Sequence, residues 1–181
     1  MPESKKPRLR SFEAAGKQQH IPESDKYLYR SEAPSNKLVV IGTGTIGQEH
    51  MRVAATLDRA SIHGIFDTSE QSLDAAEAGF KNYSSEGLVR YDDLEAACME
   101  PAADALFICT TNFTHFDVLQ VALKSGKPIF LEKPMATSLN DATRIIEQAS
   151  SYSSFIQIGL QYRYKAQYVE AFHEALSRRS L

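Results

Sequence analysis

Three glycines spaced Gly42-x-Gly44-x-x-Gly47 are the residues best suited to chemistry, and they directly follow an apolar run, residues 38–41. A glycine turn between a strand and a helix lets the backbone approach a pyrophosphate, and the N–H groups of the helix N-terminus favour its charge. We expect Gly42 to permit the tight turn, Gly44 to admit the pyrophosphate and Gly47 to let the helix pack on the strand. The residues between them in the predicted phosphate loop are Thr43, Thr45 and Ile46.

An acidic residue, Asp67, ends the next apolar segment at the separation typical of a dinucleotide-binding unit. A carboxylate here can accept two hydrogen bonds from the adenosine ribose, and it repels a 2′-phosphate. Residues 68–72 contain no Arg or Lys to hold such a phosphate, so NAD is favoured over NADP. The plainer alternative is that Asp67 only caps the next helix. A methyltransferase, which also has a glycine-rich first turn, is a further alternative.

The polar segment from Thr110 to His115 follows an apolar run that ends at Cys109. In an open α/β sheet the loops at the carboxyl ends of the strands line the ligand crevice. Thr110, Thr111 and Asn112 can therefore hydrogen-bond a nicotinamide ribose or close over the cofactor. His115 is either a residue on the cofactor side or a structural residue that starts the next helix.

Glu132-Lys133-Pro134 follows the apolar run 129–131, again at the predicted carboxyl end of a strand. A lysine there can exchange a proton with a substrate hydroxyl or orient that hydroxyl for hydride loss. Glu132 can accept hydrogen bonds from the cofactor ribose or hold Lys133. Pro134 fixes the turn, and the Lys133–Pro134 bond is a candidate for the cis isomer. Taken alone, this tripeptide is a common surface turn.

Alternating strand-like and helix-like segments from Lys37 onward must position these residues. The strand-like segments are residues 37–41, 61–66, 104–109, 128–131 and 155–158, with 88–91 as a weaker sixth. The helix-like segments are residues 46–57, 69–78, 93–99, 115–124 and 138–149. Nearly continuous apolar strands are typical of a parallel sheet with helices on both faces. The sequence therefore predicts an α/β fold with a doubly wound parallel sheet.

Composition excludes several classes of function. The 181 residues are 43% hydrophobic and 24% charged with a formal net charge of -3, which is ordinary for a globular protein and gives no sign of nucleic-acid binding. No apolar run is long enough to span a membrane, and the N-terminus lacks the apolar segment of a secretory signal. Cys98 and Cys109 lack the spacing of a metal site and are predicted to be buried free thiols. We therefore expect a cytoplasmic protein without a metal.

The two ends of the chain differ from the middle. Residues 1–36 are polar and interrupted by prolines, so we expect a flexible extension; its basic cluster, residues 5–10, is a solvated tail or, alternatively, a nuclear-import signal. Residues 161–181 begin an amphipathic helix with Val169, Phe172 and Leu176 on one side. Because no later element follows to bury that side, we expect the start of a truncated second domain after a dinucleotide-binding domain at 37–160.

Together these motifs resemble the glucose–fructose oxidoreductase, inositol dehydrogenase and rhizopine-catabolism (Gfo/Idh/MocA) family. The resemblance covers residues 37–163 and includes the glycine turn, Asp67, the loop 110–115 and the segment 126–134, Gly-Lys-Pro-Ile-Phe-Leu-Glu-Lys-Pro. Thr111 stands where the family usually has Pro. The segment 159–163, Gly-Leu-Gln-Tyr-Arg, is similar to the family's exit from the Rossmann domain.

The resemblance implies an NAD(P)-dependent oxidoreductase that transfers a hydride between the nicotinamide and a CH–OH group of a sugar, polyol or related compound. It implies that Lys133 is the catalytic-site lysine and that Arg163 approaches the substrate or cofactor. The family's second domain supplies the substrate pocket and much of the oligomer interface, so a homo-oligomer is expected only where that domain is present. The alternative for this chain is a non-catalytic dinucleotide-binding module.

Overall fold

The computed structural model describes residues 36–57, 60–82 and 84–177. The predicted N-terminal extension, residues 1–36, lies outside the described residues apart from Asn36. That residue begins the first strand and therefore belongs to the sheet. The strands are β1 (Asn36–Ile41), β2 (Ala60–Phe66), β3 (Val89–Arg90), β4 (Ala105–Ile108), β5 (Ile129–Leu131) and β6 (Ile156–Ile158). The α-helices are α2 (Thr45–Leu57), α3 (Glu70–Phe80), α4 (Leu94–Met99), α5 (His115–Ala122), α6 (Leu139–Ser151) and α7 (Ala166–Ser177). Three 3-10 turns are η2 (Asn112–Thr114), η3 (Leu123–Ser125) and η4 (Gln161–Tyr164).

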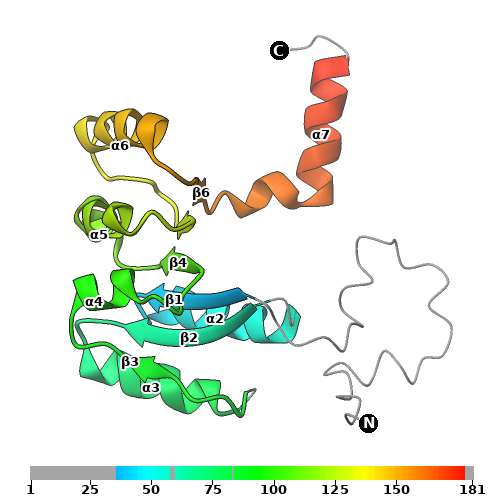
Figure 1. Ribbon diagram of the computed structural model, residues 1–181. Helices are drawn as coiled ribbons and strands as arrows, with labels where there is room; N and C mark the ends of the chain where they lie inside the picture. Colours follow the sequence, from blue (N-terminus) through cyan, green and yellow to red (C-terminus); the bar gives the residue numbers. More distant parts are fainter. Residues whose placement is uncertain (1–35, 58–59, 83, 178–181) are drawn as a thin grey trace, which may run out of the picture.

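The strands form one parallel sheet in the order β3-β2-β1-β4-β5-β6 (Figure 1). The chain runs outward from β1 in one direction through β2 and β3, and then returns to place β4 on the other side of β1. This reversal between β1 and β4 is the point at which doubly wound sheets bind their ligands. The predicted fold class is confirmed.

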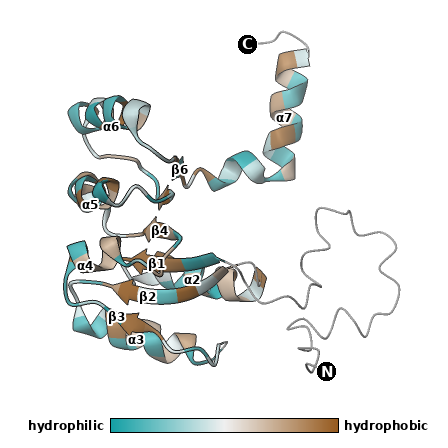
Figure 2. Cartoon of the chain, viewed as in Figure 1, coloured by the Kyte–Doolittle hydropathy of each residue, from teal (hydrophilic) through white to brown (hydrophobic). Residues whose placement is uncertain are grey.

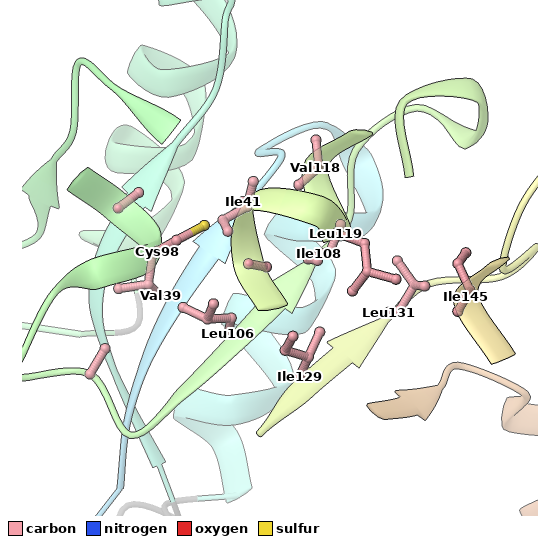
Figure 3. Close-up of a cluster of buried hydrophobic side chains, with 13 residues drawn as sticks. Val39, Ile41, Cys98, Leu106, Ile108, Val118, Leu119, Ile129, Leu131 and Ile145 are labelled. Atoms are coloured by element: carbon pink, nitrogen blue, oxygen red, sulfur yellow. The ribbon is translucent and has the colours of Figure 1, made fainter. Parts of the chain in front are cut away.

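Two apolar clusters, one on each face, hold the helices to the sheet. On one face, strand residues such as Val40 and Ile65 pack with Met51 of α2 and Leu73 of α3. On the other face, side chains of β1, β4 and β5 pack against α4, α5 and α6 (Figure 3). The strands are accordingly coloured as apolar along much of their length in Figure 2. The central strands are thus covered on both sides, which explains their continuous apolar sequences.

Capping side chains set the starts of three helices. Ser69, Asp93 and Ser138 each accept a hydrogen bond from a main-chain N–H in the first turn, so each helix begins one residue later than predicted. Ser138 and Asp141 form a variant of the capping box, in which the Ser138 hydroxyl donates to Asp141 Oδ2 at 2.7 Å while accepting the Asp141 N–H. Gly126, in the left-handed region at φ 68°, ends the η3 turn after α5.

The apolar sides of helices α6 and α7 are largely exposed. Apolar residues recur at helical spacing along α6, at Leu139, Ala142, Ile145, Ile146 and Ala149. Of these only Ile145 is buried, whereas Leu139 is 85% exposed and Ile146 is 62% exposed. Helix α7 forms where expected but has no buried residue, and it projects away from the layered domain in Figure 1. No helix within the described ranges is long and apolar enough to cross a membrane.

Candidate functional site

The glycine turn after β1 has the geometry that a phosphate loop requires. Gly42 has φ 91°, and a Cβ there would lie 2.6 Å from the Thr110 nitrogen. A Cβ on Gly47 would collide with the Gly42 carbonyl oxygen, so helix α2 approaches the turn closely only because residue 47 is glycine. At Gly44 the position that a Cβ would take has nothing within 4 Å and faces open space. This open position is where a ligand's phosphates can approach the main chain.

The N-terminus of α2 points its first amide groups at the same place. The first main-chain hydrogen bond of the helix runs from Gln48 N–H to Gly44 O at 3.0 Å. The N–H groups of Thr45, Ile46 and Gly47 precede it, so the helix itself provides no carbonyl for them. Three amide donors and the positive end of the helix dipole favour an anion at this position.

Asp67 is bonded to the glycine turn. Its Oδ2 accepts the N–H of Thr43 at 2.7 Å and the Thr43 hydroxyl at 3.2 Å, and its Oδ1 accepts the N–H of Ser69 at 2.9 Å. The N-cap of α3 is Ser69, so Asp67 is not the capping residue of that helix. Thr43 itself is fully buried, which makes it a support of the turn that does not line the cleft.

A cleft of about 610 Å³ opens along the carboxyl ends of β2, β1 and β4. Its wall combines the glycine turn with the end of β2, the start of α3 and the loop after β4. The lining residues are Gly42, Gly44, Thr45, Ile46, Phe66, Asp67, Thr68, Ser69, Ser72, Leu94, Cys109, Thr110, Thr111, Thr114 and Val118. The structure therefore gathers the phosphate turn, the acid and the threonine loop around one space, as a dinucleotide requires.

The loop after β4 divides into a cleft side and a buried side. Thr110 and Thr111 line the cleft, whereas Asn112 lies exposed outside it. His115 is fully buried, with Nδ1 at 2.7 Å from Pro134 O and Nε2 at 3.1 Å from Thr110 O. The ring therefore ties the loop after β4 to the loop after β5, and of its two predicted roles this contact matches the structural one.

Lys133 lies at the end of β5 with an exposed side chain. Its N–H donates to Glu132 Oε2 at 2.9 Å, and the Lys133–Pro134 bond is cis. Glu132 Oε1 lies 2.9 Å from His50 Nε2, so the carboxylate is held by a histidine of α2. Within the described ranges no side-chain hydrogen bond or ion pair occupies the Lys133 ammonium group, which leaves it free to meet a ligand.

A second cavity, of about 440 Å³, brings Lys133 together with Arg163. The other residues that line it are Gly159, Leu160, Gln161 and Tyr162, from the segment that follows β6. Two cations from separate elements thus border one open space beside the end of β5. The sequence singled out these two residues but did not indicate the lining from 160 to 162.

The arginine of β3, Arg90, is paired with carboxylates of α3 and is not available to a ligand in the cleft. Arg90, on β3, is bonded to Glu70 at 2.6 Å and Asp74 at 2.8 Å, and Glu77 lies at 3.6 Å. The hydrogen bond to Asp74 and the surrounding carboxylates raise the pKa of Arg90 further. This guanidinium is therefore engaged with α3, and it does not line the cleft.

Neither cysteine has the properties of a nucleophile. Burial raises the pKa of Cys109 strongly, and the negative charge of Glu132 adds to that effect. Burial also raises the pKa of Cys98 to about 11, against the opposing charge of Lys127. Both thiols are free and stay protonated near neutral pH. No group of three or more His, Cys, Asp or Glu side chains suited to a metal ion occurs in the described part of the chain.

His50, three residues after Gly47, belongs to the site but was not predicted from the sequence. Its ring contacts Phe107 and Phe130 edge-on, and the partner of its Nε2 is 82 residues away in sequence. The sequence does show a histidine one helical turn after the glycine motif. Its contact with Glu132 becomes evident only in the structure, where α2 lies next to the end of β5.

Comparisons with known proteins agree with this geometry. The model of an oxidoreductase family with an NAD-binding Rossmann fold (GFO_IDH_MocA) matches residues 36–160. Inositol 2-dehydrogenase of Paracoccus denitrificans is 33% identical over 135 residues, covering 74% of this chain and 39% of the relative. Glucose-6-phosphate 3-dehydrogenase of Bacillus subtilis is 30% identical over 128 residues, covering 71% and 34%.

Solved structures give the same result. The crystal structure of myo-inositol dehydrogenase from Lactobacillus casei, in complex with NAD(H) and myo-inositol, is similar with a TM-score of 0.71 at 30% identity, covering 79% of this chain and 41% of that one. The chain spans about two fifths of the length of the relatives it matches. It belongs to the Gfo/Idh/MocA oxidoreductase family, of which it carries the NAD-binding Rossmann domain.

Proposed function

We propose that this chain binds NAD(H) and serves as the cofactor half of a dehydrogenase that acts on a CH–OH group of a sugar, polyol or related compound. The observation that carries the proposal is the cleft that joins the open face of Gly44 to Asp67. The phosphates would lie against the amides of Thr45 to Gly47, and the adenosine ribose would lie at Asp67. The relatives named for inositol and glucose 6-phosphate support the substrate class.

NAD is favoured over NADP by charge. A 2′-phosphate at Asp67 would meet a carboxylate, and residues 68–72 contain no cation to compensate. Arg90 offers no substitute, because its guanidinium is paired with carboxylates of α3. The proposed cofactor is therefore NAD.

Lys133 is the residue proposed to act on the substrate. A bound nicotinamide supplies the hydride acceptor or donor. The Lys133 ammonium group, free of protein partners within the described ranges, would hold the substrate hydroxyl and exchange its proton. Arg163, across the same cavity, would contact the substrate or the cofactor. Thr110 and Thr111 would contact the cofactor from the loop after β4.

A second candidate is a dinucleotide-binding module without catalysis of its own. It is favoured by the absence, among the described residues, of an acid or histidine paired with the Lys133 side chain. The exposed apolar side of α7, with Val169, Phe172 and Leu176, further supports residues 161–177 as the start of a second domain.

The two free thiols favour a reducing compartment such as the cytoplasm.

Thermal unfolding in the presence of ligands tests the binding proposal. A ligand that binds only the folded state at 100 times its Kd stabilises that state by about 2.7 kcal/mol. NADH should raise the Tm in a concentration-dependent manner, and S-adenosylmethionine should not. A Tm that rises with S-adenosylmethionine alone would replace this proposal with a methyltransferase.

A further inference from the structure

His50 links the helix that begins at the phosphate turn to the strand end that carries Lys133. It lies on the second turn of α2, and its Nε2 is 2.9 Å from Oε1 of Glu132 at the end of β5. The two side chains are 25% and 15% exposed, so the contact is largely shielded from water. A shielded hydrogen bond to a carboxylate is stronger and more directional than one at the surface.

Two aromatic rings fix the orientation of the His50 imidazole. Phe107 of β4 and Phe130 of β5 stack on each other with centroids 4.9 Å apart. The His50 ring meets both edge-on, at 5.7 Å from Phe107 and 4.9 Å from Phe130. Such edge-to-face contacts favour one orientation of the ring. The imidazole is therefore aimed at Glu132 by the sheet itself.

The Glu132 carboxylate links the oriented imidazole to the main chain of Lys133. Its second oxygen, Oε2, accepts the N–H of Lys133 at 2.9 Å. Glycine at position 159, directly after β6, leaves room for the first oxygen, because a Cβ there would lie only 3.1 Å from Oε1. With both oxygens bonded, the carboxylate fixes the main chain at Lys133 and therefore the starting point of the Lys133 side chain.

We propose that His50 is a positioning residue that, through Glu132, sets the main chain of Lys133 against the nicotinamide half of the cofactor. This inference rests on the proposed function. The structural alternative is that the pair only joins α2 to the sheet, in which case its loss would change stability without changing where Lys133 lies.

The first test is a nuclear magnetic resonance measurement that needs no cofactor. In His50→Leu the Lys133 amide should shift, and its hydrogen exchange should accelerate about tenfold or more relative to the amides of β1. His50→Gln, whose side-chain N–H can reach the same carboxylate, should restore both values. His63→Leu is the matched control, because His63 has similar exposure and faces Glu100 at 3.8 Å, in a different part of the sheet. An unchanged Lys133 amide in His50→Leu would overturn the proposal.

The second test compares NADH with ADP-ribose, which lacks the nicotinamide. Wild type should bind NADH more tightly than ADP-ribose, and His50→Leu should lose about tenfold in NADH affinity while ADP-ribose affinity stays within about twofold. His50→Gln should recover most of the loss, and His63→Leu should leave both affinities unchanged. Equal losses for the two ligands would overturn the positioning role. Failure of wild type to bind either ligand would instead overturn the proposed function, while the amide test would still decide the role of His50.

Discussion

Asp67 Oδ2 accepts both the main-chain N–H of Thr43, at 2.7 Å, and the Thr43 hydroxyl, at 3.2 Å. The acid that ends β2 is thereby bonded to the glycine turn that follows β1. One carboxylate thus holds the phosphate turn in shape and also faces the cleft. Removal of the whole side chain changes both properties, whereas a substitution that keeps an oxygen and removes the charge separates them.

We predict that Asp67→Ala weakens NADH binding by about tenfold or more, because a hydrogen bond to a charged group is lost. Asp67→Asn keeps an oxygen for the Thr43 N–H but removes the charge that repels a 2′-phosphate. It should therefore narrow the preference for NADH over NADPH with a smaller loss of NADH affinity. Fluorescence titration of each variant with both cofactors measures these affinities. A wild-type preference for NADPH would contradict the assignment of Asp67 to the ribose.

Gly47→Ala should destabilise the fold by about 1–3 kcal/mol, the usual range for overpacking, because its Cβ would collide with the Gly42 carbonyl oxygen. Gly87→Ala is the matched control, since nothing lies within 4 Å of a Cβ there. It should change the free energy of unfolding by less than about 0.5 kcal/mol. Urea denaturation compares the two, and equal stabilities would refute the close packing of α2 on the turn.

The two cysteines should resist thiol reagents in the native state and react after unfolding. The folded pKa of Cys98, about 11, is above its ordinary value of 9. The folded state therefore retains the thiol proton more tightly than the unfolded state. The resulting contribution to the free energy of unfolding is fully present below pH 9 and is lost as pH rises from 9 towards 11. Absorbance of the released aromatic thiolate from a disulfide reagent at pH 8 measures the reactivity. Rapid labelling of the native chain would contradict the burial of both thiols.

The 181-residue chain should bind cofactor yet show negligible turnover on polyols and sugars. Positioning substrate at the reacting atom can lower the barrier by ~7–11 kcal/mol, and the open cavity beside Lys133 supplies little of it. In a longer form that is active, Lys133→Met should lower kcat by about 10²–10⁴-fold while NADH affinity changes little. If Lys133→Met left the kcat of an active longer form unchanged, the role given to the lysine would be refuted. Robust turnover by the 181-residue chain would refute the claim that catalysis requires a closed substrate pocket outside these residues.

Local sequence predicted the elements well, because continuous apolar runs and capping residues act over a few positions. The weak strand at 88–91 shortened to Val89–Arg90, since only these two residues pair with β2. The apolar stripe of α6 predicted more burial than Ile145 alone provides, because the sheet narrows to three-residue strands beneath it.

The site was predictable in its glycines and its acid, whose spacing is set by one strand-turn-helix-strand unit. The contacts of His115 and His50 were not, because their partners lie on loops and strands brought near only by the order of the sheet. Nothing in the sequence indicated that Thr43 turns inward to Asp67, which places it outside the cleft. Such contacts depend on tertiary adjacency, which no local pattern encodes.

Calorimetric titration of NADH into wild type and Gly44→Ala tests the central claim most directly. The new Cβ would face open space, so the variant should fold with unchanged stability. That space is where the phosphates are proposed to lie, so NADH affinity should fall by at least about tenfold, the equivalent of about 1.4 kcal/mol. Saturable binding by wild type, lost in a stably folded Gly44→Ala, is the predicted result. Equal NADH binding by the two proteins, or no binding by wild type, would contradict a dinucleotide site at this turn.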